Sequence, residues 1–197
     1  MRDCYSRERF ILTLIPTALI VGGVLVSDAA LDKGGEHNCG WLIFAGGWLM
    51  LALTLMTKIN PDGYWKIHFT KENTYKALGA VTVMASAIFA QRALVKRDPA
   101  QIKSAMILFM LSWALFALLL GYDFEKGKFN RTKLLLAGTG AFFIVSSMAI
   151  LTLKDRKYSV QAIQNEQFNT GNVFSFGLPL FTLGWVLIIM SISVINK

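Results

Sequence analysis

Ionisable residues are nearly absent from long parts of this chain. Only 16% of its 197 residues are charged and 54% are hydrophobic, whereas about a quarter of a typical soluble protein is charged. Between their flanking charges the apolar stretches contain no ionisable residue except Arg92, which lies near one end. Because such residues mark ion paths, proton relays and catalytic groups inside bilayers, their scarcity argues against a proton-coupled transporter, a retinal protein and a membrane enzyme.

Histidine and cysteine are also scarce, with two of each. A zinc site needs three or four ligands, and His37 with Cys39 and Glu36 makes a poor candidate because His68 lies in a different connection. No Ser/His/Asp or Cys/His arrangement can be assembled. Cys4 and Cys39 flank the first apolar stretch, so we expect no disulfide between them. We therefore predict no catalytic residue, no metal and no cofactor.

What the chain does have is six long apolar stretches. Most of them approach the roughly 20 residues that a helix needs to cross a bilayer, and they are continuously apolar, unlike the alternating strands of a membrane barrel. The stretches are Phe10 to Val26, Trp41 to Thr57, Ala77 to Ala90 (or to Val95 if extended past Arg92), Ser104 to Tyr122, Leu134 to Leu153 and Val173 to Ile195. The sequence predicts one all-α integral membrane domain over residues 1–197, a bundle of six transmembrane helices at about 10–27, 41–57, 75–95, 101–122, 133–153 and 173–195.

The first stretch shares features with a signal peptide, namely a basic start and a small residue at either side of Asp28. Its apolar run from Phe10 to Val26 is longer than the usual signal core of about 7 to 15 residues. We therefore expect it to be retained as the first membrane helix. Lys and Arg are more numerous in the termini and in the second and fourth connections than in the other connections. The positive-inside rule then places both termini on the cytoplasmic or interior side.

Three tryptophans lie near the middle of the second, fourth and sixth stretches, although Trp usually prefers the membrane interface. A small residue precedes each of them, as the pairs Gly47-Trp48, Ser112-Trp113 and Gly184-Trp185 show. Small residues let neighbouring helices approach closely and leave room for a large ring. We predict that these six residues pack helices against one another.

The tryptophans also suggest an internal repeat. When the segments after Trp48 and Trp113 are aligned on Lys76 and Lys133, several positions agree, namely Leu78/Leu135, Ala80/Ala137, Thr82/Thr139, Leu94/Leu151 and Asp98/Asp155. This favours two copies of a helical hairpin that run in the same direction, with the last stretch beginning a third copy.

A stripe of small residues follows one face of the third predicted helix. Thr82, Ser86 and Ala90 are spaced four apart, so they share one face. Such stripes draw helices together, which is the interpretation we favour, and a hydroxyl-lined ion path is the alternative. No carboxylate or histidine accompanies the stripe, as transport sites generally require.

The net charge of +8 indicates acidic partners. The predicted basic surface consists of Lys126, Lys128, Arg131, Lys96 and Arg97. Basic loops beside a bilayer attract anionic lipid or another acidic surface. Direct contact with nucleic acid is left open by the charge alone.

These observations favour a non-enzymatic, multi-pass membrane protein with a structural or scaffolding role. Its partners would be the lipid bilayer and other protein subunits of a larger assembly. Two kinds of assembly stay open, the membrane or capsid layer of a virus and an organellar complex. The alternative function is a passive channel or small-solute carrier lined by Ser, Thr and backbone carbonyl groups, and a membrane enzyme ranks third.

Overall fold

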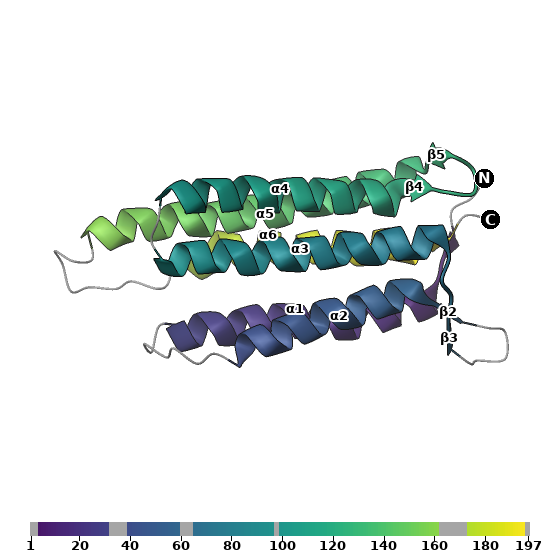
Figure 1. The fold of residues 1–197 in the computed structure, drawn as a ribbon, viewed down its shortest axis with the longest axis horizontal. Helices are drawn as coiled ribbons and strands as arrows, with labels where there is room; N and C mark the ends of the chain where they lie inside the picture. The colour runs from purple at the N-terminus through teal and green to yellow at the C-terminus, as the bar shows by residue number, and fades with distance from the viewer. Residues whose placement is uncertain (1–3, 32–38, 60–64, 97–98, 162–172, 196–197) are drawn as a thin grey trace.

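The computed structural model describes residues 4–31, 39–59, 65–96, 99–161 and 173–195, and most of them form six helices. The helices are α1 Arg7–Leu31, α2 Gly40–Met56, α3 Lys71–Lys96, α4 Pro99–Gly121, α5 Arg131–Gln161 and α6 Val173–Ser193. They lie along one common direction (Figure 1). Each helix packs against the next one in the sequence, and α6 also packs against α1, so the bundle closes on itself.

Three short antiparallel ribbons lie at one end of this bundle. Strands β2 (Thr57–Ile59) and β3 (Trp65–Ile67) pair, as do β4 (Tyr122–Asp123) and β5 (Lys128–Phe129). The third ribbon joins the two ends of the chain, because β1 (Cys4–Tyr5) pairs with β6 (Val194–Ile195). Figure 1 shows the labelled strands and both termini at the same end, which we call the strand end.

The helices that leave the strand end begin at equivalent capping residues. A side-chain oxygen three residues earlier accepts a backbone N–H in the first turn, which satisfies a donor that has no partner within the helix. These bonds run from Arg9 N–H to Ser6 Oγ (3.2 Å) in α1, from Asn73 N–H to Thr70 Oγ1 (3.2 Å) in α3 and from Lys133 N–H to Asn130 Oδ1 (2.9 Å) in α5. The same chemistry thus starts α1, α3 and α5.

Glycines bring two helix pairs into backbone contact. A Cβ atom on Gly184 of α6 would lie 2.8 Å from the carbonyl oxygen of Gly140 in α5. A Cβ atom on Gly47 of α2 would lie 2.7 Å from the backbone nitrogen of Ile20 in α1. Because these contacts are to backbone atoms, a larger residue at either position would have to push two helices apart.

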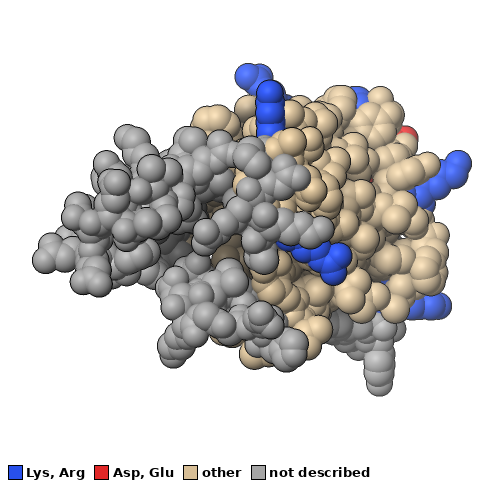
Figure 2. All heavy atoms as spheres, turned by 60° about the vertical axis from the view of Figure 1, so that its left-hand side comes forward, with Lys and Arg blue, Asp and Glu red and all other residues tan. Residues whose placement is uncertain are grey.

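The outer surface of the bundle is apolar on every helix. Large exposed hydrophobic side chains include Leu14, Leu42, Leu78, Leu111, Phe142 and Leu183, one from each helix. On the face drawn in Figure 2, tan side chains make up most of the described surface, and a few Lys and Arg side chains project from it. Buried apolar side chains from all six helices fill the interior as well.

The prediction of an all-α bundle of six helices is confirmed. By length and composition two of the described helices could cross a bilayer, Arg7–Val26 within α1 and Ala100–Gly121 within α4, and Gly40–Met56 and Pro179–Ser193 are shorter apolar helices. Core helices of soluble proteins and signal sequences share these properties. The helix bounds also differ from the predicted ones, since α3 begins at Lys71 and α5 reaches Gln161, and the three ribbons were not predicted.

Candidate functional site

The three tryptophans meet at the centre of the bundle. Trp48 of α2, Trp113 of α4 and Trp185 of α6 have exposed fractions of 1%, 2% and 2%. Their ring centroids lie 5.7 Å apart for Trp48 and Trp113, 5.5 Å for Trp48 and Trp185, and 5.7 Å for Trp113 and Trp185. We call this triangle the aromatic centre. These separations suit favourable edge-to-face ring contacts.

A phenylalanine one helical turn before each tryptophan extends the aromatic centre. The contacting pairs are Phe44 with Trp48 (6.2 Å), Phe109 with Trp113 (6.4 Å) and Phe181 with Trp185 (6.4 Å). All three phenylalanines are buried. Since residues four apart share a helix face, α2, α4 and α6 present the same two rings to the interior.

The tryptophans also share a depth in the bundle. Each of them lies the same number of residues before the last residue of its helix, which is Met56 in α2, Gly121 in α4 and Ser193 in α6. A strand begins directly after each of these last residues. The equal spacing explains why three indoles from distant parts of the chain reach one level.

The aromatic centre holds polar groups without partners. The indole Nε1 atoms of Trp48, Trp113 and Trp185 are buried and have no hydrogen-bond acceptor among the described residues, and the same is true of Trp41. A buried N–H group without an acceptor costs free energy. Ring packing must therefore outweigh that cost, which places these indoles among the main packing elements of the interior.

The small residues before the tryptophans do not all behave alike. Gly47 and Gly184 contact the backbones of α1 and α5, as described above. Ser112, which occupies the same position in α4, is 7% exposed and donates its hydroxyl hydrogen to the carbonyl oxygen of Leu108 at 2.8 Å. In α4 a serine therefore stands where α2 and α6 have the glycine that contacts the backbone of the neighbouring helix.

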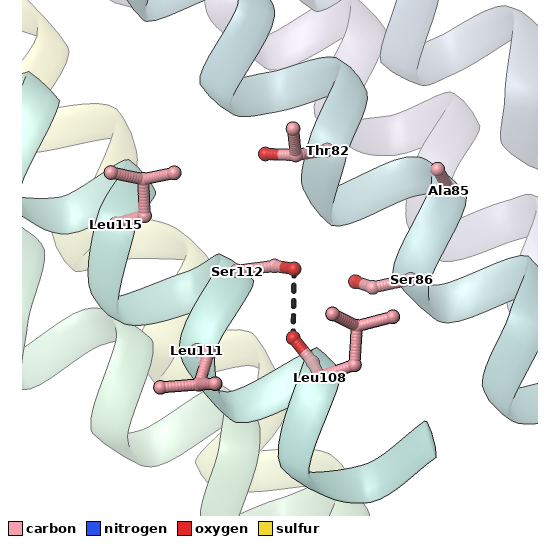
Figure 3. Close-up of a pocket in the computed structure, with 7 residues that line it drawn as sticks. All are labelled: Thr82, Ala85, Ser86, Leu108, Leu111, Ser112 and Leu115. Carbon is pink, nitrogen blue, oxygen red and sulfur yellow. Dashed lines mark hydrogen bonds between the residues drawn. The ribbon is translucent and has the colours of Figure 1, made fainter. Parts of the chain in front are cut away.

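A groove opens between α3 and α4 next to Ser112. Its volume is about 390 Å³, and it is lined by Thr82, Ala85 and Ser86 of α3 and by Leu108, Leu111, Ser112 and Leu115 of α4 (Figure 3). We call it the outer groove, because Leu108, Leu111 and Leu115 are among the exposed side chains of the bundle surface. Its lining is almost entirely apolar.

The predicted small-residue stripe lies partly in this groove. Thr82 is exposed, Ser86 is buried and Ala90 is half-buried. The hydroxyl groups of Thr82 and Ser86 donate to carbonyl oxygens of their own helix, those of Gly79 (2.7 Å) and Val83 (2.8 Å). Both residues therefore line the outer groove, and their hydroxyl groups are already hydrogen-bonded within α3. The aromatic centre lies elsewhere, in the interior of the bundle.

The predicted basic residues fall at two ends of the molecule. Lys126, Lys128 and Arg131 are exposed at the strand end, on or beside the β4–β5 ribbon. Lys96 is the last residue of α3, at the opposite end of the bundle, and its side chain and the whole of Arg97 lie outside the described residues. The structure thus brings three of the five together.

The turn that carries Lys126 and Lys128 has a defined shape. The Lys126 N–H group donates to Asp123 Oδ1 at 3.1 Å, and Gly127 adopts a positive φ of 61° that favours glycine. Phe124 stacks on Tyr75 of α3, with centroids 5.4 Å apart and rings 6° from parallel. The ribbon is therefore anchored to the bundle, and it presents its cations on a fixed frame.

No metal site is evident in the described part of the chain, where no three His, Cys, Asp or Glu side chains gather as a metal ion would need. Glu36 and His37 lie outside the described residues, and Cys39 is exposed before α2. Comparison of the chain with known protein families, with curated proteins and with solved structures finds no match to any of them.

Proposed function

We propose that this protein is a non-enzymatic, multi-pass integral membrane protein that acts as a structural subunit of a larger membrane-associated assembly. The observation that carries the proposal is the outward apolar surface of all six helices around an equally apolar interior. Soluble proteins rarely expose contiguous apolar patches larger than a few hundred Å². A surface of this kind fits lipid or other membrane subunits.

The distribution of charge supports an attachment surface at the strand end. The short strands and the first turns of the helices there carry exposed cations such as Lys66, Lys71, Lys128 and Arg131. The apolar helix surface lies next to them. Cations at this level attract anionic lipid headgroups or an acidic layer of partner protein. The strand end would then be the cytoplasmic or interior side, with both termini on it.

We also propose that the bundle consists of three β-α-α-β units. The third unit ends at β6, which pairs with β1, the first strand of the first unit. Support comes from the equivalent caps, from the three ribbons and from the Phe and Trp spacing of α2, α4 and α6. The caps Thr70 and Asn130 align Ala77 with Ala137. The alignment on Lys76 and Lys133 paired Ala80, not Ala77, with Ala137. The two alignments therefore differ by about one helical turn of α3.

The alternative, a passive channel, has less support. An ion path along the bundle axis would have to pass three tryptophans in mutual contact. The hydroxyl groups that could line a path, those of Thr82 and Ser86, lie in the outer groove. A solute path through that groove would need a second subunit to close it.

Charge removal at the strand end is the test of the scaffold. Changing Lys126, Lys128 and Arg131 to Gln removes three exposed charges, each of which contributes about 1 kcal/mol beside an anionic surface. We expect incorporation into the native assembly to fall. The difference from the wild-type protein should be largest at low salt, because salt screens the exposed charges that the variant lacks. The measurement is co-purification of partners and co-sedimentation with membranes after mild detergent extraction.

Two controls sharpen this result. Changing the exposed Lys103, near the start of α4 at the opposite end, to Gln should leave incorporation unchanged. Changing Thr82 and Ser86 to Ala should also leave it intact, because small residues still permit close packing. Selective ion flux through the purified protein in bilayers, lost in the Thr82 and Ser86 double variant, would support the channel and contradict the scaffold.

A further inference from the structure

Exposed aromatic rings precede two of the helices that begin at the strand end. Phe69 comes directly before the Thr70 cap of α3, and Phe129 comes directly before the Asn130 cap of α5. Their exposed fractions are 82% and 51%, and Phe69 is the most exposed of the large hydrophobic side chains that the structure describes. Because a phenyl ring gains free energy on leaving water, both rings favour a partner that covers them.

The exposure of Phe69 is built into the backbone on both sides of it. The His68 N–H group donates to the Met56 carbonyl oxygen at 2.8 Å, which ties the segment to the end of α2. The His68 carbonyl oxygen accepts hydrogen bonds from the Thr70 N–H group (3.1 Å) and from Asn73 Nδ2 (3.2 Å), which tie it to the start of α3. The ring is therefore held at the surface on a fixed frame.

Each ring lies between two exposed cations. These cations form no ion pair in the described part of the chain, where the two ion pairs join Lys76 to Glu72 and Lys126 to Asp123. An exposed ring between unpaired cations combines an apolar anchor with an attraction for anions. The cations are Lys66 and Lys71 around Phe69, and Lys128 and Arg131 around Phe129. We call these two sets the rim segments.

One cation of each rim segment is placed against the preference of its helix. Lys71 is the first residue of α3 and Arg131 is the first residue of α5, and Arg7 occupies the same place in α1. The N-terminal end of a helix carries a partial positive charge, so a cation there is unfavourable unless an anion lies nearby. The first turn of α5 contains no acidic residue. An anion from outside the chain would compensate both the Arg131 cation and the helix end.

We propose that the rim segments seat the strand end in the headgroup layer of a bilayer that contains anionic lipid. Apolar rings of interfacial segments reach the boundary between headgroups and acyl chains, and the cations beside them attract the negatively charged headgroups. This assignment rests on the proposed membrane location of the bundle. It names lipid as the partner of these residues, where the charge alone also fits an acidic protein.

A bilayer fits the rim segments better than an acidic protein does. The two rings come from different connections, and exposed apolar side chains follow each of them along its helix, such as Leu78 in α3 and Leu135 in α5. A bilayer surrounds the bundle and meets each connection in the same way, with the headgroup layer next to the apolar layer. A protein partner would recognise a single patch and would not require the same arrangement at two helix starts.

A fluorescent label at position 69 tests this contact in the full-length protein, reconstituted into vesicles of phosphatidylcholine and phosphatidylserine. Phe69→Cys, with Cys4→Ser and Cys39→Ser, carries the label. The reference is Lys126→Cys in the same background, because Lys126 is exposed in the turn between β4 and β5. Iodide quenches the label from water, and lipids with brominated acyl chains quench it from the bilayer. We expect brominated lipid to quench the label at position 69 and iodide to quench it at position 126.

The same label tests the cations. Brominated phosphatidylserine should quench position 69 more than an equal amount of brominated phosphatidylcholine, because Lys66 and Lys71 enrich anionic lipid there. Changing both lysines to Gln should reduce this preference about fivefold for each charge, and higher salt should reduce it in the variant that keeps them. Lys103→Gln, at the opposite end of the bundle, should leave the preference unchanged.

Each outcome decides a point. Quenching of position 69 by iodide alone, or a preference for phosphatidylserine that the change of Lys66 and Lys71 leaves intact, would overturn the proposal. Access of iodide to position 69 in vesicles, together with protection in the isolated native assembly, would assign the ring to a protein partner and would also overturn it. Failure of the protein to insert into vesicles would contradict the membrane location as well. The scaffold test changes Lys126, Lys128 and Arg131 and leaves Lys66 and Lys71 in place, so the two proposals can fail separately.

Discussion

Changing Trp113 to Ala is expected to lower the free energy of unfolding by about 3 to 5 kcal/mol, the range for emptying a large buried aromatic site. Trp113 contacts both other tryptophans and Phe109 and Phe116, so its loss removes ring contacts at the centre of three helices. Chemical and thermal unfolding in a mild detergent give the measurement. Trp113→Phe should be milder, because it keeps an aromatic ring in the same place.

Two comparisons separate packing from general damage to α4. Leu111 is 61% exposed on the same helix, so Leu111→Ala should change stability by well under the effect of Trp113→Ala. The double variant Trp48→Ala with Trp113→Ala should differ from the sum of the single effects, since residues in contact are coupled. Additive effects of Trp48 and Trp113, or no loss of stability in Trp113→Ala, would contradict the aromatic centre.

Changing Gly47 to Ala should cost about 1 to 3 kcal/mol, the range for overpacking a close contact. The added methyl group would meet the backbone nitrogen of Ile20 at 2.7 Å and the carbonyl oxygen of Pro16 at 2.9 Å. Backbone atoms cannot rotate aside, so α1 and α2 would have to separate. Unfolding of the variant in the same detergent measures the effect.

The neighbouring glycine supplies a matched control. A Cβ atom on Gly46 would meet nothing within 4 Å, and alanine favours a helix over glycine by about 1 kcal/mol. Gly46→Ala should therefore be neutral or slightly stabilising. If Gly46→Ala and Gly47→Ala have the same effect, helix propensity explains both, and the close approach of α1 and α2 does not.

The sequence predicted the helices well, because uninterrupted apolar stretches are a local signal. It placed the start of α3 near residue 75, since Lys71 and Glu72 break the apolar run, whereas the structure begins the helix directly after the Thr70 cap. It did not predict the ribbons. Their strands are two or three residues long, and β1 and β6 come from opposite ends of the chain, so no local pattern reveals their pairing.

The candidate site was only partly accessible from sequence. The small-residue and Trp pairs indicated packing, and a regular Phe four residues before each Trp was a further signal that could have linked the three helices. The three indoles meet because the six helices pack in a closed ring, with α6 against α1. The composition of the chain does not reveal this order. The half-buried position of Lys133 depends on where the Asn130 cap starts α5. A count of basic residues by connection carries no such information.

Labelling of cysteines in sealed vesicles tests the central claim, a membrane-spanning bundle with the strand end on one side. Cys39 is exposed before α2 at the opposite end, and Lys128 is exposed in β5 at the strand end. One variant keeps Cys39 and carries Cys4→Ser, and the other carries Lys128→Cys with both native cysteines changed to Ser. We expect a membrane-impermeant maleimide to label the two variants from opposite sides of the vesicle. Labelling of both from the same side, or recovery of the protein as a soluble species without detergent, would contradict the account.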